Sequence, residues 1–169
     1  MRNIFKISIA LIIVSFVAAC GAKKKEVTRE DRIQAGKAAG EASYANFRGD
    51  FAAAERALVR AVELDPFNAD NWFDLGIARI RIKDKSGAKA AFKEVLSVCK
   101  DNAAKDPNNV AWLVKQIRPM VLLNRVSDAR ALQEKILKQF PNDRQVGVFA
   151  DAKAIDKLLE DPLWKELNS

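Results

Sequence analysis

The amino-acid sequence predicts an all-α fold in which helical hairpins repeat along the chain. Three observations lead to this fold class. From Arg32 onward, apolar residues recur at helical spacing almost without interruption. The pattern recurs after 34 residues, from Ala54 to Ala88. Of the 169 residues, 49% are hydrophobic and 30% are charged, with 7 Gly and 5 Pro, which is globular composition and excludes disordered or collagen-like chains.

Residues 1–19 form a separate segment with the pattern of an export signal. Arg2 and Lys6 supply positive charge, a mostly apolar run follows over residues 7–17, and two alanines come next. This run is too short to cross a membrane as a helix, which needs about 20 residues. We therefore expect a cleaved signal peptide, with an uncleaved N-terminal anchor as the alternative.

The end of this segment, Val17-Ala18-Ala19-Cys20, resembles the lipobox of bacterial lipoproteins, with Val17 in place of the commoner Leu. The resemblance implies cleavage between Ala19 and Cys20 and a lipid on Cys20, whose two or three acyl chains give stable attachment to a membrane. The two residues after the cysteine lack the Asp that favours retention at the inner membrane. The resemblance thus implies a lipid anchor in the bacterial cell envelope, at the outer membrane and facing the periplasm.

Residues 20–31 are predicted to be a charged tether between the lipid and the fold. A single large apolar side chain, Val27, stands among many charges. The three consecutive lysines at 23–25 have two interpretations. We favour a solubilising spacer over contact with anionic lipid headgroups.

The unit that repeats is clearest between Asp50 and Pro66. Asp50 is placed to cap a helix, an apolar face follows, and Pro66 ends the helix. The next shift along the chain is 41 residues, from Ala88 to Ala129, which is one repeat plus seven inserted residues. The insertion falls at residues 100–109, a stretch rich in Asn and Asp that is predicted to be a polar hinge.

This periodicity resembles the tetratricopeptide repeat, a helix-turn-helix unit of 34 residues. The matching residues are Trp72, Leu75 and Gly76 in the first helix of a unit, and Ala88 and Phe92 in the second. The resemblance implies an α-solenoid of three such repeats over residues 32–142. The repeats begin near Ala35, Ala69 and Val110.

Two departures from the family pattern bear on packing. The first repeat lacks the family's large apolar residues over 35–44, and its Gly36 and Gly40 indicate only close packing of the backbone. In the third repeat, Pro119 removes one hydrogen bond of the helix and clashes with the carbonyl four residues earlier. We therefore expect a kink or break near Ile117.

Residues 143–169 are predicted to close the array with capping helices. The apolar pattern over 146–159 predicts an amphipathic helix, and Pro162 is suited to the first position of a short last helix. A stacked helical array exposes its terminal apolar face unless a final helix covers it.

The residue content argues against an enzyme. The chain has no His, which excludes His-based catalysis and His metal ligands. It also has no phosphate-binding loop, nucleophile elbow or paired Cys motif, so no cofactor, metal or small-molecule substrate is predicted. Arg-rich stretches lie at 79–83 and 125–130, but export makes nucleic acid an unexpected partner. Cys99 lies in an apolar helical stretch and is predicted to be a buried structural thiol.

With an enzyme argued against, the sequence favours a role in binding other proteins. In tetratricopeptide arrays the first helix of each repeat lines a concave groove that accepts peptides or partner helices, and the resemblance implies such a groove here. The positions carried over are Phe47, Phe73, Ile77, Ile80, Arg81, Val114, Arg118 and Val121. They form an apolar groove with a basic edge, which suits an amphipathic or extended segment with acidic residues. Any single one of these apolar positions could equally belong to the core.

Two functions are consistent with these features. The first is an adaptor or scaffold lipoprotein that binds an envelope protein or peptide, for instance in outer-membrane assembly, secretion or cell-wall machinery. The second is a structural lipoprotein that self-associates and has no foreign partner. Sedimentation distinguishes them, because self-association predicts a dimer and an adaptor predicts a monomer.

Overall fold

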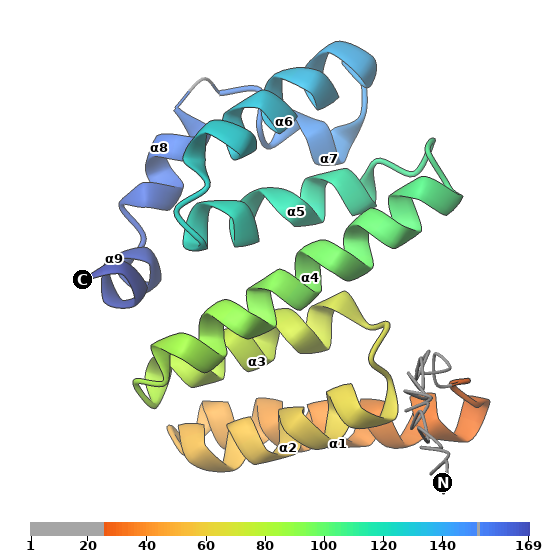
Figure 1. Ribbon diagram of the computed structural model, residues 1–169, viewed down its shortest axis with the longest axis vertical. Coiled ribbons are helices and arrows are strands. Elements are labelled where there is room, and N and C mark those ends of the chain that lie inside the picture. The colour runs from red at the N-terminus through yellow and green to blue at the C-terminus, as the bar shows by residue number, and fades with distance from the viewer. Residues whose placement is uncertain (1–25, 152) are drawn as a thin grey trace, which may run out of the picture.

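The described part of the chain is entirely helical and turn-like, as the all-α prediction requires. The computed structural model describes residues 26–151 and 153–169, and its helices form a stack of antiparallel hairpins (Figure 1). The helices are α1 (Arg29–Phe47), α2 (Phe51–Leu64), α3 (Ala69–Arg81), α4 (Lys85–Lys105), α5 (Ala111–Leu122), α6 (Val126–Gln139), α7 (Arg144–Gly147), α8 (Ala154–Leu159) and α9 (Pro162–Asn168). Helices α1 to α6 pack in chain order as three hairpins, which confirms the predicted solenoid of three helix-turn-helix units.

The turn inside each hairpin has the same geometry. Gly49, Lys83 and Asn124 occupy the left-handed region, with φ of 76°, 67° and 60°. Their spacing of 34 and then 41 residues is the spacing found in the sequence. Asp50 accepts a hydrogen bond from the N–H of Ala53, which confirms the predicted cap of α2. The third hairpin therefore turns in the same register as the first two.

The seven inserted residues extend a helix and do not form a hinge. Helix α4 has 21 residues, whereas α2 and α6 have 14 each. The predicted polar hinge over 100–109 is thus wrong for residues 100–105. Ala and Lys near the end of α4 favour the helix. It ends at Asp106 because a residue before proline is disfavoured in the helical conformation.

Helix α5 runs through Pro119 without the break predicted near Ile117. The missing N–H of Pro119 leaves one carbonyl of the helix without its usual donor, at a cost of about 3 kcal/mol. Ile117, Val121 and Leu122 are each 1% exposed or less, and burial of each such side chain contributes about 1.5–3 kcal/mol. Tertiary packing of α5 therefore outweighs the local penalty.

Helix α1 begins inside the segment predicted to be tether. Thr28 caps the helix in a reciprocal arrangement with Asp31.

Helix α1 packs against α2 through small side chains. The buried residues of α1 are Ala35, Ala38 and Ala42. A Cβ added at Gly36 or Gly40 would meet nothing within 4 Å, so the prediction that these glycines allow close backbone packing is wrong within the described residues.

The segment after α6 forms short helices. Helices α7 and α8 are separated by non-helical residues. The prediction of one amphipathic helix over 146–159 is therefore wrong for the described residues between Gly147 and Ala154. Pro162 occupies the start of α9, as predicted. Within the described residues, no helix is both long and apolar enough to cross a membrane.

Helices α3 and α4 approach closely where Gly76 meets Phe92. A Cβ built on Gly76 lies 2.5 Å from Cε1 of Phe92, and that ring is 0% exposed and confined by its neighbours. Gly76 is therefore needed for α3 and α4 to pack at this distance.

Replacement of two helical glycines by alanine should change stability in opposite directions. Gly76→Ala should lower the free energy of unfolding by about 1–3 kcal/mol, because the added methyl overpacks the Phe92 site. Gly40→Ala, in the open face of α1, should raise it by about 0.5–1 kcal/mol through helix propensity alone. Urea unfolding followed by circular dichroism measures both. Shifts of the same sign would contradict this account of the α3–α4 contact.

Candidate functional site

The best candidate site is a cavity of about 180 Å³ between α3 and α5. Three of the predicted groove residues, Phe73, Val114 and Arg118, line it together. The complete lining is Ala69, Asp70, Phe73, Val95, Val114, Lys115, Arg118 and Pro119. The walls are mainly apolar, and the charged groups stand on α3 and α5.

Two cations at this cavity are held by aromatic rings and carboxylates. The guanidinium of Arg118 lies 5.2 Å from the ring centroid of Phe73, and its Nη2 is 3.0 Å from a carboxylate oxygen of Asp161. The Nζ of Lys115 is 2.7 Å from Asp70. Cation–π contacts and ion pairs of this kind orient the basic groups across the cavity. Of the two basic groups beside this cavity, Arg118 is among the predicted groove residues and Lys115 is not, and both are paired.

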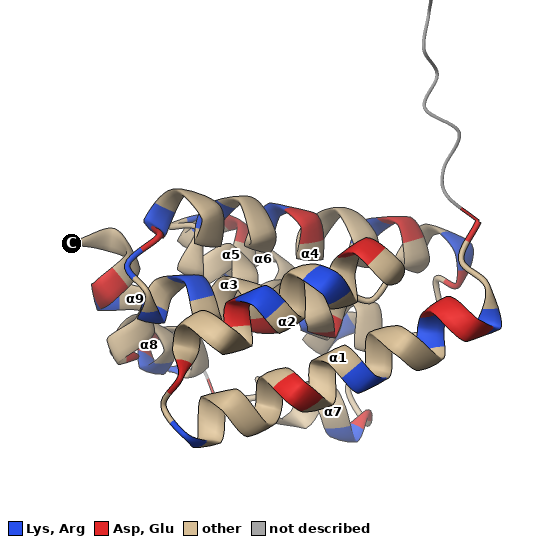
Figure 2. Ribbon diagram, turned by 90° about the horizontal axis from the view of Figure 1, so that it is seen from below, with Lys and Arg blue, Asp and Glu red and all other residues tan. Residues whose placement is uncertain are grey.

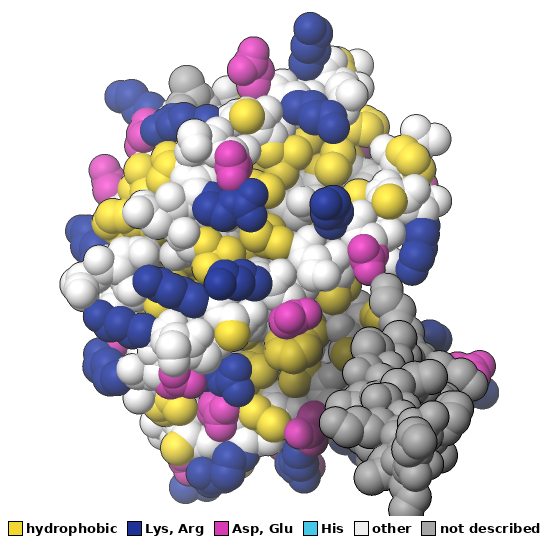
Figure 3. Space-filling view, in the orientation of Figure 1, with side chains coloured by type: hydrophobic (Ala, Val, Ile, Leu, Met, Phe, Trp, Pro, Cys, Tyr) yellow, Lys and Arg dark blue, Asp and Glu magenta, His cyan; other side chains and the backbone are white. Residues whose placement is uncertain are grey.

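Charge elsewhere on the molecule is mixed in sign. Basic and acidic side chains are interspersed along the helices (Figure 2). On the face shown in Figure 3, apolar side chains gather in separate patches among basic ones. The cavity between α3 and α5 is thus marked by its apolar recess and not by a large surface charge of one sign.

Helix α9 occupies the adjacent end of the predicted groove. Leu163 and Leu167 are buried in a cluster with Ile80, Phe92 and Leu122. The amide nitrogen of Asn168 donates to the carbonyl of Leu122 at 3.1 Å. The groove between the ends of α3 and α5 is therefore filled by a segment of the same chain.

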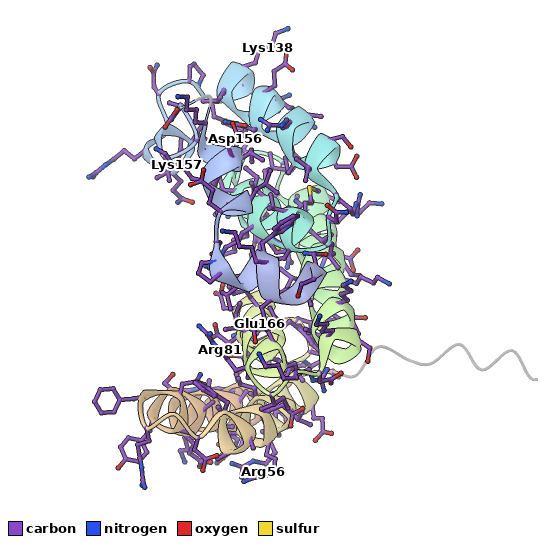
Figure 4. All side chains as sticks on the ribbon, turned by 90° about the vertical axis from the view of Figure 1, so that its left-hand side faces the viewer. Arg56, Arg81, Lys138, Asp156, Lys157 and Glu166 are labelled. Atoms are coloured by element: carbon purple, nitrogen blue, oxygen red, sulfur yellow. The ribbon has the colours of Figure 1, made fainter. Side chains whose placement is uncertain are left out.

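Two basic residues at and just after the end of α3 hold the carboxylate of Glu166 in α9. Glu166 pairs with Lys83, in the turn after α3, and lies 3.8 Å from Arg81. Figure 4 shows Glu166 beside Arg81. The hydrogen bond from Lys83 lowers the pKa of Glu166 from its usual value, with smaller contributions from the neighbouring positive charges. Glu166 is therefore ionised at neutral pH.

The remaining predicted positions lie in other surroundings. Ile80 and Val121 are each 1% exposed and belong to the core. Ile77 is half-buried against the cluster that contains α9. Phe47, at the end of α1, is 88% exposed and does not line the cavity. Ala19 and Cys20 lie outside the described residues.

Sequence reasoning missed α9 as an occupant of the groove. The signal was present, because the last helix carries Leu163 and Leu167 four residues apart together with acidic residues. That is the chemistry predicted for a ligand of the basic-edged groove. Only the fold brings the two segments together, since Lys83 and Glu166 are 83 residues apart in the chain.

Asp74 of α3 is exposed and does not line the cavity. Partial desolvation of its carboxyl group, and then the charge of Asp70, raises the pKa of Asp74. No group of three or more His, Cys, Asp or Glu side chains in residues 26–151 and 153–169 could hold a metal ion.

Solved structures with a similar fold share low sequence identity with this chain. The second tetratricopeptide (TPR) domain of human RPAP3, in complex with an HSP70 peptide, is 14% identical, with a TM-score of 0.48, 78% of this chain covered and 99% of that chain. The TPR2B domain of yeast Sti1, in a pHsp70 complex, is 17% identical, with a TM-score of 0.48 and coverage of 80% and 96%. An O-GlcNAc transferase of Thermobaculum terrenum is 20% identical, with a TM-score of 0.45 and coverage of 81% and 26%. No protein-family model and no curated protein matches the chain.

The thiol of Cys99 should be unreactive in the folded protein. Cys99 is 0% exposed, and its burial raises the pKa to about 11, so only about one thiol in a thousand is ionised at pH 8. In a Cys20→Ser background, iodoacetamide should label Cys99 in urea but not in native buffer at pH 8, as mass spectrometry would show. Native labelling at the rate of a free thiol would contradict the buried position.

Proposed function

We propose that this chain is a non-catalytic, protein-binding lipoprotein that holds a segment of another envelope protein between α3 and α5. The observation that carries the proposal is the recess lined by Phe73, Val114 and Pro119, with Lys115 and Arg118 at its sides. Apolar walls with a few oriented charges suit a partner side chain that is apolar and flanked by acidic groups.

The size of the recess favours a protein segment over a small-molecule substrate. Sites for small molecules and cofactors occupy about 300–1,000 Å³. The cavity here has about 180 Å³, which is room for roughly one or two side chains. A peptide or helix that inserts such a side chain would contact α3 and α5 at the same time.

The proposed membrane anchor rests on the sequence Val17-Ala18-Ala19-Cys20. With α1 beginning at Arg29, the chain between Cys20 and the fold could span about 30 Å at most, at about 3.5 Å per residue. The binding module would then remain within one domain diameter of the membrane surface. In this proposal the protein is an adaptor at the outer membrane that faces the periplasm.

The anchor is tested by metabolic labelling. Cells that express the chain with its natural sequence should incorporate radiolabelled palmitate into it, and Cys20→Ala should abolish incorporation because the acylated sulfur is lost. Cys99→Ala is the matched control and should keep the label, since Cys99 is buried. Labelling that survives in the Cys20→Ala protein would disprove the lipid site.

The binding site is tested by photo-crosslinking in intact cells. A photoreactive amino acid at Val114, on the cavity wall, should give a discrete covalent adduct with another envelope protein. The same amino acid at Ser97, exposed on α4, is the control and should give none. Adducts at both positions, or at neither, would argue against a partner between α3 and α5.

A further inference from the structure

Helix α9 fills its end of the groove in the way a bound peptide would. It is a short amphipathic helix whose Leu163 and Leu167, four residues apart, present one apolar stripe. This stripe is buried against Ile80, Phe92 and Leu122, which come from three other helices. The contact has the form of a helix laid in a groove.

The charges of α9 complement those of the groove at both ends. Asp161, which caps α9, pairs with Arg118 of α5 at 3.0 Å. Near the other end, Glu166 lies beside Arg81, the last residue of α3 (Figure 4), and pairs with Lys83 in the turn that follows. An apolar stripe between two carboxylates is thus matched by an apolar groove between basic groups.

Two features show that α9 is an imperfect occupant. The indole N–H of Trp164 is buried and has no hydrogen-bond partner among the described residues, which is unfavourable for a polar group. The basic side chains that hold α9 are largely open to solvent, with 44% exposure for Arg81, 72% for Lys83 and 43% for Arg118. Exposed ion pairs contribute little to stability, so the docking of α9 depends mainly on the apolar contacts of Leu163, Leu167 and the partly buried Trp164.

We propose that α9 is an internal occupant of the binding groove, and that the foreign partner is a short amphipathic helix with leucines four residues apart and flanking carboxylates, which displaces it. This inference rests on the proposed function and specifies the partner and the regulation of the same site. The protein binds its partner only while α9 is undocked. The apparent Kd therefore equals the Kd of the open groove divided by the fraction of molecules in which α9 is undocked.

The partner has an advantage that α9 lacks. The cavity lined by Phe73 and Val114 shares Arg118 with the contacts of α9, and α9 is not part of its lining. A partner helix that extends past the position of Asp161 would place a side chain in this cavity. It would also avoid burial of an unpaired indole N–H if it carried a leucine or phenylalanine at the position of Trp164.

The test is trans binding of the peptide that α9 represents. The probe is a fluorescent peptide of residues 160–169, and the full chain purified in detergent is titrated by fluorescence anisotropy. An opened variant, Leu163→Asp with Leu167→Asp, should bind the peptide at least about tenfold more tightly than the natural chain, since its groove is vacated. A peptide with Phe in place of Trp164 should bind the opened variant several-fold more tightly still.

Controls separate displacement from general damage. Glu166→Arg opposes Arg81 and Lys83 and should also increase peptide binding, whereas Lys165→Glu, on the exposed side of α9, should leave it unchanged. A peptide with alanine at both leucine positions should not bind. If the double variant loses its helical circular dichroism, the test rests on whether Glu166→Arg increases peptide binding. Equal peptide affinity of the natural chain and the folded opened variants, or no binding by any of them, would overturn the inference.

Hydrogen exchange on the natural chain gives an independent measurement. The amides of α9 should exchange at least about tenfold faster than those of α3 and α5, because α9 undocks without global unfolding. Equal protection would show a permanent cap and overturn the inference. An adduct at Val114 without peptide binding would support the proposed binding function and contradict the proposed partner helix. Peptide binding without an adduct would support displacement of α9 and contradict an envelope partner at Val114.

Discussion

The contact between the ring of Phe92 and the backbone of α3 at Gly76 is the constraint on which the rest of the structure depends. The ring is 0% exposed and belongs to one cluster with Ile80 of α3, Leu122 of α5 and the leucines of α9. Because Gly76 has no side chain, α3 and α4 come close enough for the ring to reach all three. The same aromatic residue therefore joins the second hairpin to the third and forms the floor on which α9 rests.

Much of the fold could be predicted because its signals are local. Caps such as Asp50 and terminators such as Pro66 act on the backbone of the next few residues, and the recurrence of the turns follows the repeat found in the sequence. The helical conformation of the inserted residues could not be predicted from such local signals. Asp101 and Asn102 are typical of turns, but α4 packs against α5, and this packing favours the helix over a turn.

The candidate site could be predicted only in part, because exposure depends on residues far away in the chain. Phe73, Val114 and Arg118 line one cavity, since the first helices of adjacent repeats share a side of the stack. Ile80 and Val121 have the same spacing on their helices but lie under other parts of the chain. The docking of α9 depends on pairs such as Arg118 and Asp161, 43 residues apart, which no local pattern reveals.

The length of α4 has a consequence for how this architecture can change in evolution. Seven residues are almost two full turns, so their insertion rotates the far end of a helix by only about 20°. The apolar side of α4 thus continues to face Trp112 and the third hairpin while the helix grows by about 10 Å. Insertions of one or two residues would swing that side toward solvent. Natural variation in length at this boundary should therefore occur in steps close to a heptad, as in a coiled coil.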